Sequence, residues 1–282
     1  MLSQSEKKFI KENYPSNGCK FCADNLKINK SKIMNFVFRN NIKVNYDIFV
    51  NKNRFRKNKI DINVFKENIN QYSAYILGFL WADGHLSEKN RYNIGTEITT
   101  KDAEKILSIF LKTGDWSSYS ITSPSKKKWQ PQTKIFCSCK ELFKFLEEND
   151  YVKKSDVVGP TKILSLIPKE FHNYFFRGLS DGDGCFYFNG KQYLRQYSIA
   201  SSYNQDWGFF TDLLDNLSIE KYKCKKSKVI NKKSGKLNGS SCIRITNKED
   251  IKKLGNYIYS GELFGLERKY EIYKKIIFIP TL

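Results

Sequence analysis

No run of apolar residues in this 282-residue sequence approaches the roughly 18 that a membrane-spanning helix needs. The opening residues, MLSQSEKKFIKENYP, also lack the apolar segment of a signal peptide. We therefore expect a protein that is not secreted and that works in the cytoplasm of a bacterial or phage-infected cell, or in an organelle.

Histidines and closely paired cysteines are scarce. There are two histidines, and the seven cysteines are an odd number scattered along the chain, which favours free thiols over a disulfide framework. Cys19 and Cys22 have the spacing of half a zinc site, but neither a matching pair nor a histidine lies nearby in the sequence. We expect these two cysteines on one buried face of a helix instead.

Acidic residues are few: 29 Asp+Glu stand against 49 Lys+Arg, and the formal net charge is +20. A chain with 40% hydrophobic residues can fold, and a folded body with this charge repels itself unless a polyanion lies beside it. An AT-rich coding sequence also enriches lysine, but it does not explain why residues 1–60 hold 14 basic and 4 acidic residues. With membrane segments excluded, the charge predicts a nucleic-acid partner.

Residues 1–42 predict three short helices. A serine at position 3 or 5 can begin the first, Pro15 ends it, Gly18 opens the second and Asn29 caps the third. Two short helices, a tight turn and a basic second helix form the helix-turn-helix plan, in which the second helix enters the DNA major groove. A three-helix cap with a solvated basic face is the alternative. The candidate DNA-binding side chains of the third helix are Lys30, Lys32, Asn35 and Arg39.

Residues 43–70 predict a basic linker. The segment NKNRFRKNK at 51–59 carries five positive charges, no acids and no periodic apolar pattern. It would lie extended along a phosphate backbone through Arg54, Arg56 and Lys57, or form a solvated loop.

From residue 71 the chain repeats one order of elements: helix, strand, strand, helix, strand, strand, helix. Each copy opens with an apolar helix that ends in Asp-Gly, within AYILGFLWADGHL and NYFFRGLSDGDGCFYF. We therefore predict an α+β fold of two similar half-domains, 71–160 and 161–282, with a small all-α domain before them.

The two Asp-Gly helices carry small residues four positions apart: Gly78 and Ala82 in the first, Gly178 and Gly182 in the second. Small residues one turn apart leave no side-chain ridge, so the two helix backbones can approach closely. Ser73 can cap the first of these helices. The glycine of each Asp-Gly suits the left-handed residue that commonly closes a helix.

Asp83 and Asp183 are harder to justify structurally, because a helix C-terminus already carries partial negative charge. Packing two such ends together would bring two carboxylates side by side. A divalent cation such as Mg²⁺ would resolve this conflict, since it prefers oxygen ligands from converging segments. Metal-held carboxylates are also what phosphodiester hydrolysis requires. The plain alternative is that each Asp-Gly is an ordinary turn.

The segments ILGFLWADG at 76–84 and FRGLSDGDG at 176–184 resemble the two motifs of a single-chain LAGLIDADG homing endonuclease, and the resemblance covers about residues 71–282. It implies two αββαββα half-domains packed through their motif helices about a pseudo-twofold axis within a monomer, with each sheet over the major groove of double-stranded DNA. It also implies cleavage of both strands at a long target site, which promotes the mobility of the protein's own gene or intron.

The resemblance implies that Asp83 and Asp183, with the preceding Ala82 and Gly182, bind catalytic Mg²⁺ or Mn²⁺. One departure is Trp81, which stands where the family usually has an acid, whereas the second copy keeps Asp181. Basic residues around the cleaved phosphates are a further implication. The candidates are Lys101, Lys154 and Lys269, for which a phosphate-contacting surface lysine is an equally good interpretation.

DNA-reading residues should lie on the faces of the sheets. The segments RYNIGTEITTK and KQYLRQYSIASS alternate between polar and apolar residues, as strands do. Alternation alone does not decide which set faces DNA. The candidates are Arg91, Asn93, Thr96, Arg195, Gln196 and Ser198.

Three functions compete. The first is a Mg²⁺-dependent, site-specific DNA endonuclease. The second is a non-cleaving protein of the same fold, either a DNA-binding regulator or a maturase for intron RNA; such regulators have typically lost the catalytic acids, which this chain keeps. The third is a generic basic structural protein, which the internal duplication disfavours.

Overall fold

A computed structural model of the chain divides into two units, Met1–Lys57 and Asn58–Leu282. It describes residues 2–45, 60–88, 92–121, 130–152, 154, 158–230 and 237–279. The boundary between the units lies inside the predicted linker. The first unit contains α1 (Gln4–Leu26) and α2 (Lys30–Arg39).

Helix α1 consists of two helical stretches joined at a kink. Its first turn is held by a capping box, in which the Ser3 hydroxyl accepts from the Glu6 amide at 3.2 Å and the Glu6 carboxylate accepts from the Ser3 amide. The helix continues through Pro15 and breaks at Gly18, whose φ of 74° is non-helical. The predicted end at Pro15 is therefore wrong: the φ that proline imposes is compatible with a helix, whereas Gly18 can adopt a positive φ that L side chains avoid.

The second half of α1 and α2 are joined by a short turn. Lys27 takes the left-handed conformation with φ 53°, and the Asn29 side chain accepts from the Ser31 amide at 2.9 Å to cap α2. Both helices then close over one small apolar core. Its buried members are Ile10, Tyr14, Cys22, Ala23, Ile33 and Val37.

The second unit begins with α4 (Asn63–Lys66) and then shows the duplicated order. The first copy comprises α5 (Gln71–Asp83), β1 (Gly84–Ser87), β2 (Asn93–Thr99), α6 (Thr100–Phe110), the 3-10 helix η1 (Leu111–Thr113), β3 (Ser117–Ile121), β4 (Gln132–Ser138) and α7 (Lys140–Glu148). The second comprises α8 (Thr161–Leu166), η3 (Lys169–Phe171), α9 (His172–Gly182), β5 (Gly184–Asn189), β6 (Leu194–Ser202), α10 (Gly208–Asn216), β7 (Tyr222–Ile230), β8 (Leu237–Ile245), α11 (Lys248–Ile258) and α12 (Glu267–Phe278). The predicted α+β class with two αββαββα copies is confirmed.

Both sheets are four-stranded and antiparallel, and they share one topology. The strand orders are β1-β2-β4-β3 and β5-β6-β8-β7. Each sheet buries one face against helices, through alternating residues such as Ile94 and Ile98 in β2 and Tyr197 and Ile199 in β6. We call the opposite face of each sheet its open face.

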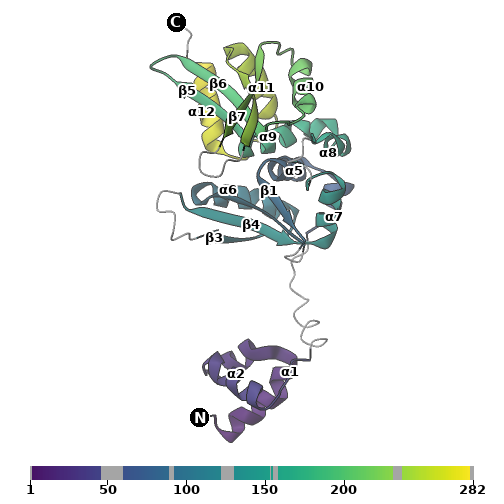
Figure 1. Ribbon diagram of the computed structural model, residues 1–282, viewed down its shortest axis with the longest axis vertical. Coiled ribbons are helices and arrows are strands. Elements are labelled where there is room, and N and C mark those ends of the chain that lie inside the picture. The colour runs from purple at the N-terminus through teal and green to yellow at the C-terminus, as the bar shows by residue number, and fades with distance from the viewer. Residues whose placement is uncertain are drawn as a thin grey trace. The chain divides into compact units, whose positions relative to one another are not determined.

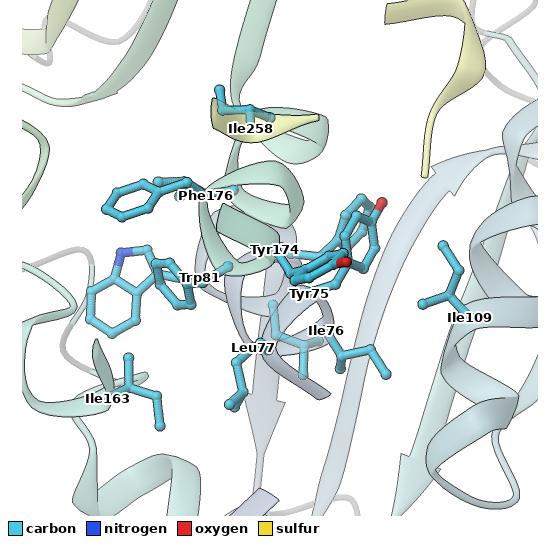
Figure 2. Close-up of a cluster of buried hydrophobic side chains, with 14 of the residues drawn as sticks. Tyr75, Ile76, Leu77, Trp81, Ile109, Ile163, Tyr174, Phe176 and Ile258 are labelled. Carbon is cyan, nitrogen blue, oxygen red and sulfur yellow. The ribbon is translucent and has the colours of Figure 1, made fainter. Parts of the chain in front are cut away.

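Helices α5 and α9 lie between the two sheets (Figure 1). Helix α5 is capped by Asn70, which accepts from the Tyr72 and Ser73 amides, and Ser73 returns a bond as the third helical residue rather than serving as the cap. Side chains of both helices, including Ile76, Leu77 and Phe176, are buried in a core shared by the two half-domains (Figure 2). Within the described residues, no helix has the combination of length and apolarity that crossing a membrane demands.

Candidate metal and nucleic-acid site

The two motif helices touch through their backbones. A Cβ added to Gly78 would overlap the carbonyl oxygen of Phe175, and one added to Gly178 would overlap that of Tyr75. One turn further on, a Cβ at Gly182 would overlap the side chain of Ala82. The small-residue positions predicted for this interface therefore lie where α5 and α9 come closest, and the contact extends to the last turn of both helices.

The glycine after each aspartate has a different role from the one expected. Gly84 has φ −74°, and Gly184 is not among the positive-φ glycines of the described chain, so neither is a left-handed helix end. Each opens a strand that folds back over the preceding turn. A Cβ at Gly84 would stand 2.8 Å from the Cα of Leu80, and one at Gly184 2.6 Å from the carbonyl oxygen of Ser180. Glycine is needed for this close passage, not for its handedness.

Asp83 and Asp183 end the two helices at one place. A Cβ at Gly182 would lie 3.4 Å from the Oδ2 atom of Asp83. Both carboxylates are exposed to solvent, yet the surrounding protein removes part of their hydration and raises both pKa values. The pKa of Asp183 rises to about 6, first through this desolvation and then through the negative charge of Asp83. The two carboxylates therefore repel each other at neutral pH.

Two lysines hold the helix ends: Lys269, which is buried, and Lys154, which is half-buried. The ammonium of Lys154 donates to four carbonyl oxygens at the end of α5, and that of Lys269 to three at the end of α9. The acceptors of Lys154 are Leu80, Trp81, Ala82 and Gly84, at 3.0, 2.9, 3.1 and 2.6 Å. Those of Lys269 are Ser180, Asp181 and Gly184, at 2.8, 2.6 and 2.6 Å. The two positive charges thus offset the negative ends of both helix dipoles, where the aspartates also lie.

These contacts change how the predicted catalytic lysines are interpreted. Desolvation lowers the pKa of Lys154 to about 8 and also lowers that of Lys269. An ammonium has three protons, and here they are directed at backbone carbonyls. Both lysines therefore hold the turns that carry the aspartates. Lys101 is exposed on α6, and the positive charges that act on Asp83 and Asp183 come from the other two lysines.

The donor set fits a hard divalent cation. Among the described residues, no group of three or more His, Cys, Asp or Glu side chains could hold a metal ion. A cation at Asp83 and Asp183 would therefore take two protein carboxylates, and its other positions would go to carbonyls, water or a substrate phosphate, as is usual for Mg²⁺. Of the predicted backbone ligands, the carbonyl of Ala82 already accepts from Lys154, which leaves one of its lone pairs open.

Trp81 and Asp181 stand at equivalent places in the two copies, and the structure gives each a different role. Asp181 is buried and accepts from the Tyr75 hydroxyl at 2.7 Å and from the Leu266 amide at 2.9 Å. It joins α9 to α5 and to the start of α12. Its counterpart Trp81 packs edge-on against Tyr151 instead, with ring centroids 4.9 Å apart. Asp181 is thus engaged by two protein donors and Trp81 by a ring contact, so neither adds an acid to the exposed pair of carboxylates.

A cavity of about 130 Å³ opens beside Asp183. It lies on the side of the second half-domain, and its polar wall was not foreseen in the sequence. The Oγ atom of Ser202 is buried there and has no hydrogen-bond partner among the described residues, while Gln205 accepts from Ser201 at 2.8 Å. Trp81 forms part of the apolar wall. The two carboxylates therefore have different surroundings, despite the duplicated framework.

The sheet registers separate the candidate DNA-reading residues. Arg195 shares the helix-covered face of β6 with Tyr197, whereas Gln196 lies on the open face opposite Tyr187. Ser198 also lies on the open face, whereas Thr96 is fully buried on the helix-covered face of β2. The Arg195 and Thr96 assignments therefore need correction.

Asn93 lies on the open face of its sheet but is 9% exposed and donates to the Cys137 carbonyl at 3.4 Å. It is therefore held by the protein rather than presented to DNA, which corrects its assignment as a reading residue. The sequence did not single out the basic residues of β7 and β8. Lys223 and Lys225 are exposed, and they pair across the open face with Arg244 and Cys242. Because alternate residues of a strand share a face, the segment KCKKSK could have predicted that Lys223 and Lys225 lie together.

Three of the predicted DNA-binding residues of α2, Lys32, Asn35 and Arg39, lie on one side of the helix, whereas Lys30 opens the helix on the opposite side. Lys30, Lys32, Asn35 and Arg39 are all exposed, and Ile33 and Val37 face the core. The remaining predicted contacts lie outside the described residues; these are Arg54, Arg56, Lys57 and Arg91.

No protein-family model matches this chain, and no curated protein matches it. Among solved structures, the chain is similar to the homing endonuclease I-WcaI bound to its DNA recognition sequence, with a TM-score of 0.46 and 16% sequence identity. The match covers 75% of this chain and 91% of that chain. At that similarity, the functional conclusion depends on the geometry of the site.

Proposed function

We propose that the second unit is a metal-dependent, site-specific DNA endonuclease of the LAGLIDADG homing type. It would make a double-strand break at a long target site and so promote the mobility of its own gene or intron. The single observation that carries this proposal is the pair of exposed carboxylates, Asp83 and Asp183, at the contacting ends of two helices.

The site is built at a cost to the fold, which favours a functional explanation. Two negative charges at two helix C-termini oppose the dipoles and each other, and the pKa of Asp183 rises to about 6 as a result of desolvation and the Asp83 charge. Two lysines, one half-buried and one buried, hold the same helix ends. Strongly perturbed acids in an accessible position are typical of functional sites.

The chemistry follows from what each residue can do. Asp83 and Asp183 would hold Mg²⁺ or Mn²⁺, which when bound supplies an activated water and stabilises charge on the leaving oxygen. Lys154 and Lys269 would fix the carboxylates by holding the turns that carry them. The near-twofold placement of two acids suits cleavage of two antiparallel strands, one acid for each half of the site.

Double-stranded DNA is the partner that the charge favours. Each sheet begins at the residue after an aspartate, so the open faces lead directly away from the candidate site. On the second sheet, Lys223, Lys225 and Arg244 give the open face a positive charge, and Gln196 adds an amide that can bond to base edges. The open face of the first sheet carries charges of both signs, since Glu97 pairs in register with Lys134.

The test is cleavage of the uninterrupted gene that the reading frame occupies, with Mg²⁺, with Mn²⁺ and with EDTA. Asp83→Asn and Asp183→Asn should each abolish cutting while DNA binding persists, because the shape is kept and only the charge is lost. Asp215→Asn, at an exposed position on α10, serves as the control and should cut normally. Normal cutting by either motif variant would refute the metal assignment.

The same experiment separates the alternatives. Tight binding to intron RNA with no DNA cleavage in Mg²⁺ would identify a maturase. Site-specific DNA binding with no cleavage in either metal would identify a regulator.

A further inference from the structure

We propose that the first unit reads double-stranded DNA on its own, with the outward face of α2 in the major groove and Phe38 against thymine methyl groups. This goes beyond the endonuclease proposal, since it needs neither the aspartates nor a metal. It rests on an aromatic side chain in an unusual position, and on a basic groove that borders the same helix.

Phe38 is 88% exposed, the highest value among the exposed large hydrophobic residues of the described chain. It lies three residues after Asn35 and seven after Ser31, so with 3.6 residues per turn these three side chains share one face of α2. That face points away from Ile33 and Val37, which fill the core. The aromatic ring therefore adds little to the core and is available to a partner.

The surroundings of Phe38 indicate the class of partner. Helix α2 contains no acidic residue, and Lys32 and Arg39 border its outward face. Across a groove of about 800 Å³, α1 adds Lys7, Lys8 and Lys11. Five basic residues line this groove against a single acid, Glu12. A surface of this charge fits a phosphate backbone, and the groove is placed to hold one strand while α2 faces the bases.

Once the basic groove holds the phosphate backbone, the Asn35 amide and the Phe38 ring can distinguish between bases. An asparagine side chain matches the N6 and N7 atoms of adenine, and an apolar side chain matches the methyl group of thymine. Asn35 and Phe38, one turn apart, would therefore read A·T pairs. The major groove of B-DNA admits an α-helix, whereas the corresponding groove of A-form RNA is too narrow, so the protruding helix favours DNA over duplex RNA.

The experiment uses the full chain in EDTA, so that cleavage plays no part. A randomised duplex library is selected on the wild-type protein, on Phe38→Ala and on Phe278→Ala. Phe278 is a matched control, because it is a 75% exposed phenylalanine on α12 of the second unit. We expect the wild type and Phe278→Ala to select the same motif, and Phe38→Ala to lose preference at adjacent A·T pairs.

Replacing dT by dU at those pairs removes only the methyl groups. It should weaken wild-type binding about fourfold per contacted methyl, and should not weaken Phe38→Ala further. Because Phe38 is exposed, urea unfolding of the variant, followed by far-UV circular dichroism, which includes the helices of the first unit, should match the wild type and so exclude misfolding. An unchanged selected motif with Phe38→Ala would overturn the proposal. So would a preference of the wild type for RNA over duplex DNA that is lost with the ring.

Discussion

Replacing Asp183 by asparagine should stabilise the metal-free protein. The pKa of this carboxyl group rises from 3.8 to about 6 in the folded protein, through desolvation and through the Asp83 charge. A carboxyl group whose pKa is higher in the folded state lowers stability when it is ionised, and this loss is complete above about pH 6. It disappears as the pH falls below 3.8, where the group is protonated in both states.

The size of the effect follows from the shift and from the exposure of the group. A rise from 3.8 to about 6 corresponds to about 3 kcal/mol at most. Because the carboxylate is exposed, water screens the interaction and about 1 kcal/mol is the better expectation. Asp183→Asn should therefore be about 1 kcal/mol more stable than the wild type at pH 8 in EDTA, and the difference should shrink towards pH 4.

Urea unfolding followed by tryptophan fluorescence measures this directly. All four tryptophans lie in the second unit, so their signal reports on the unit that contains the site. Asp215→Asn is the control, and its stability should change little at any pH. Adding Mg²⁺ should stabilise the wild type, by about 1.4 kcal/mol at ten times the dissociation constant, and should not stabilise Asp183→Asn. A variant that is less stable than the wild type at pH 8 in EDTA would refute the reasoning.

Three further substitutions test the framework of the site by the same unfolding assay. Gly178→Ala places a Cβ on a carbonyl oxygen of α5 and should cost about 2 kcal/mol or more, whereas Gly190→Ala, where a Cβ would meet its nearest atom at 3.4 Å, should be near neutral; equal stabilities would contradict the helix contact. Lys269→Met leaves three carbonyl oxygens without their donor and should cost about 3 kcal/mol, against little change for the exposed Lys252→Met. Arg177→Lys should also lower the free energy of unfolding by about 3 kcal/mol. The fully buried guanidinium donates to three carbonyls, which a single ammonium cannot reach in the same geometry. An unchanged urea midpoint would contradict this role of Arg177.

The burial of Arg177 could not be predicted from the sequence. Arg177 lies within the second motif helix, directly after three aromatic residues, and nothing in the sequence distinguishes it from an ordinary exposed arginine. In the structure its side chain is 0% exposed and donates to the carbonyls of Ile258, Ser260 and Glu262. These acceptors follow Arg177 by more than 80 positions in the sequence, so no local sequence pattern predicts that it is buried or what it binds.

The order of elements and the motif helices were predictable, because they depend on local periodicity and on duplication. Apolar spacing distinguishes helices from strands, and a repeated order shows that two similar half-domains must bury similar faces. The small residues at 78, 82, 178 and 182 predicted a close helix contact for the same local reason. The two candidate metal ligands were found because an aspartate at a helix end conflicts with the helix dipole.

The sequence by itself determined the fold class, the two aspartates and the excess of positive charge. Only the tertiary structure decided the faces and the long-range partners. In a strand, a shift of one residue moves every side chain to the other face, so Arg195 and Gln196 could be told apart only by their pairing with β5. Lys154 and Lys269 looked like surface lysines because their acceptors are backbone carbonyls about 70 to 90 residues away in the sequence. Backbone groups are identical in every residue, so the sequence cannot indicate which of them a buried lysine will find.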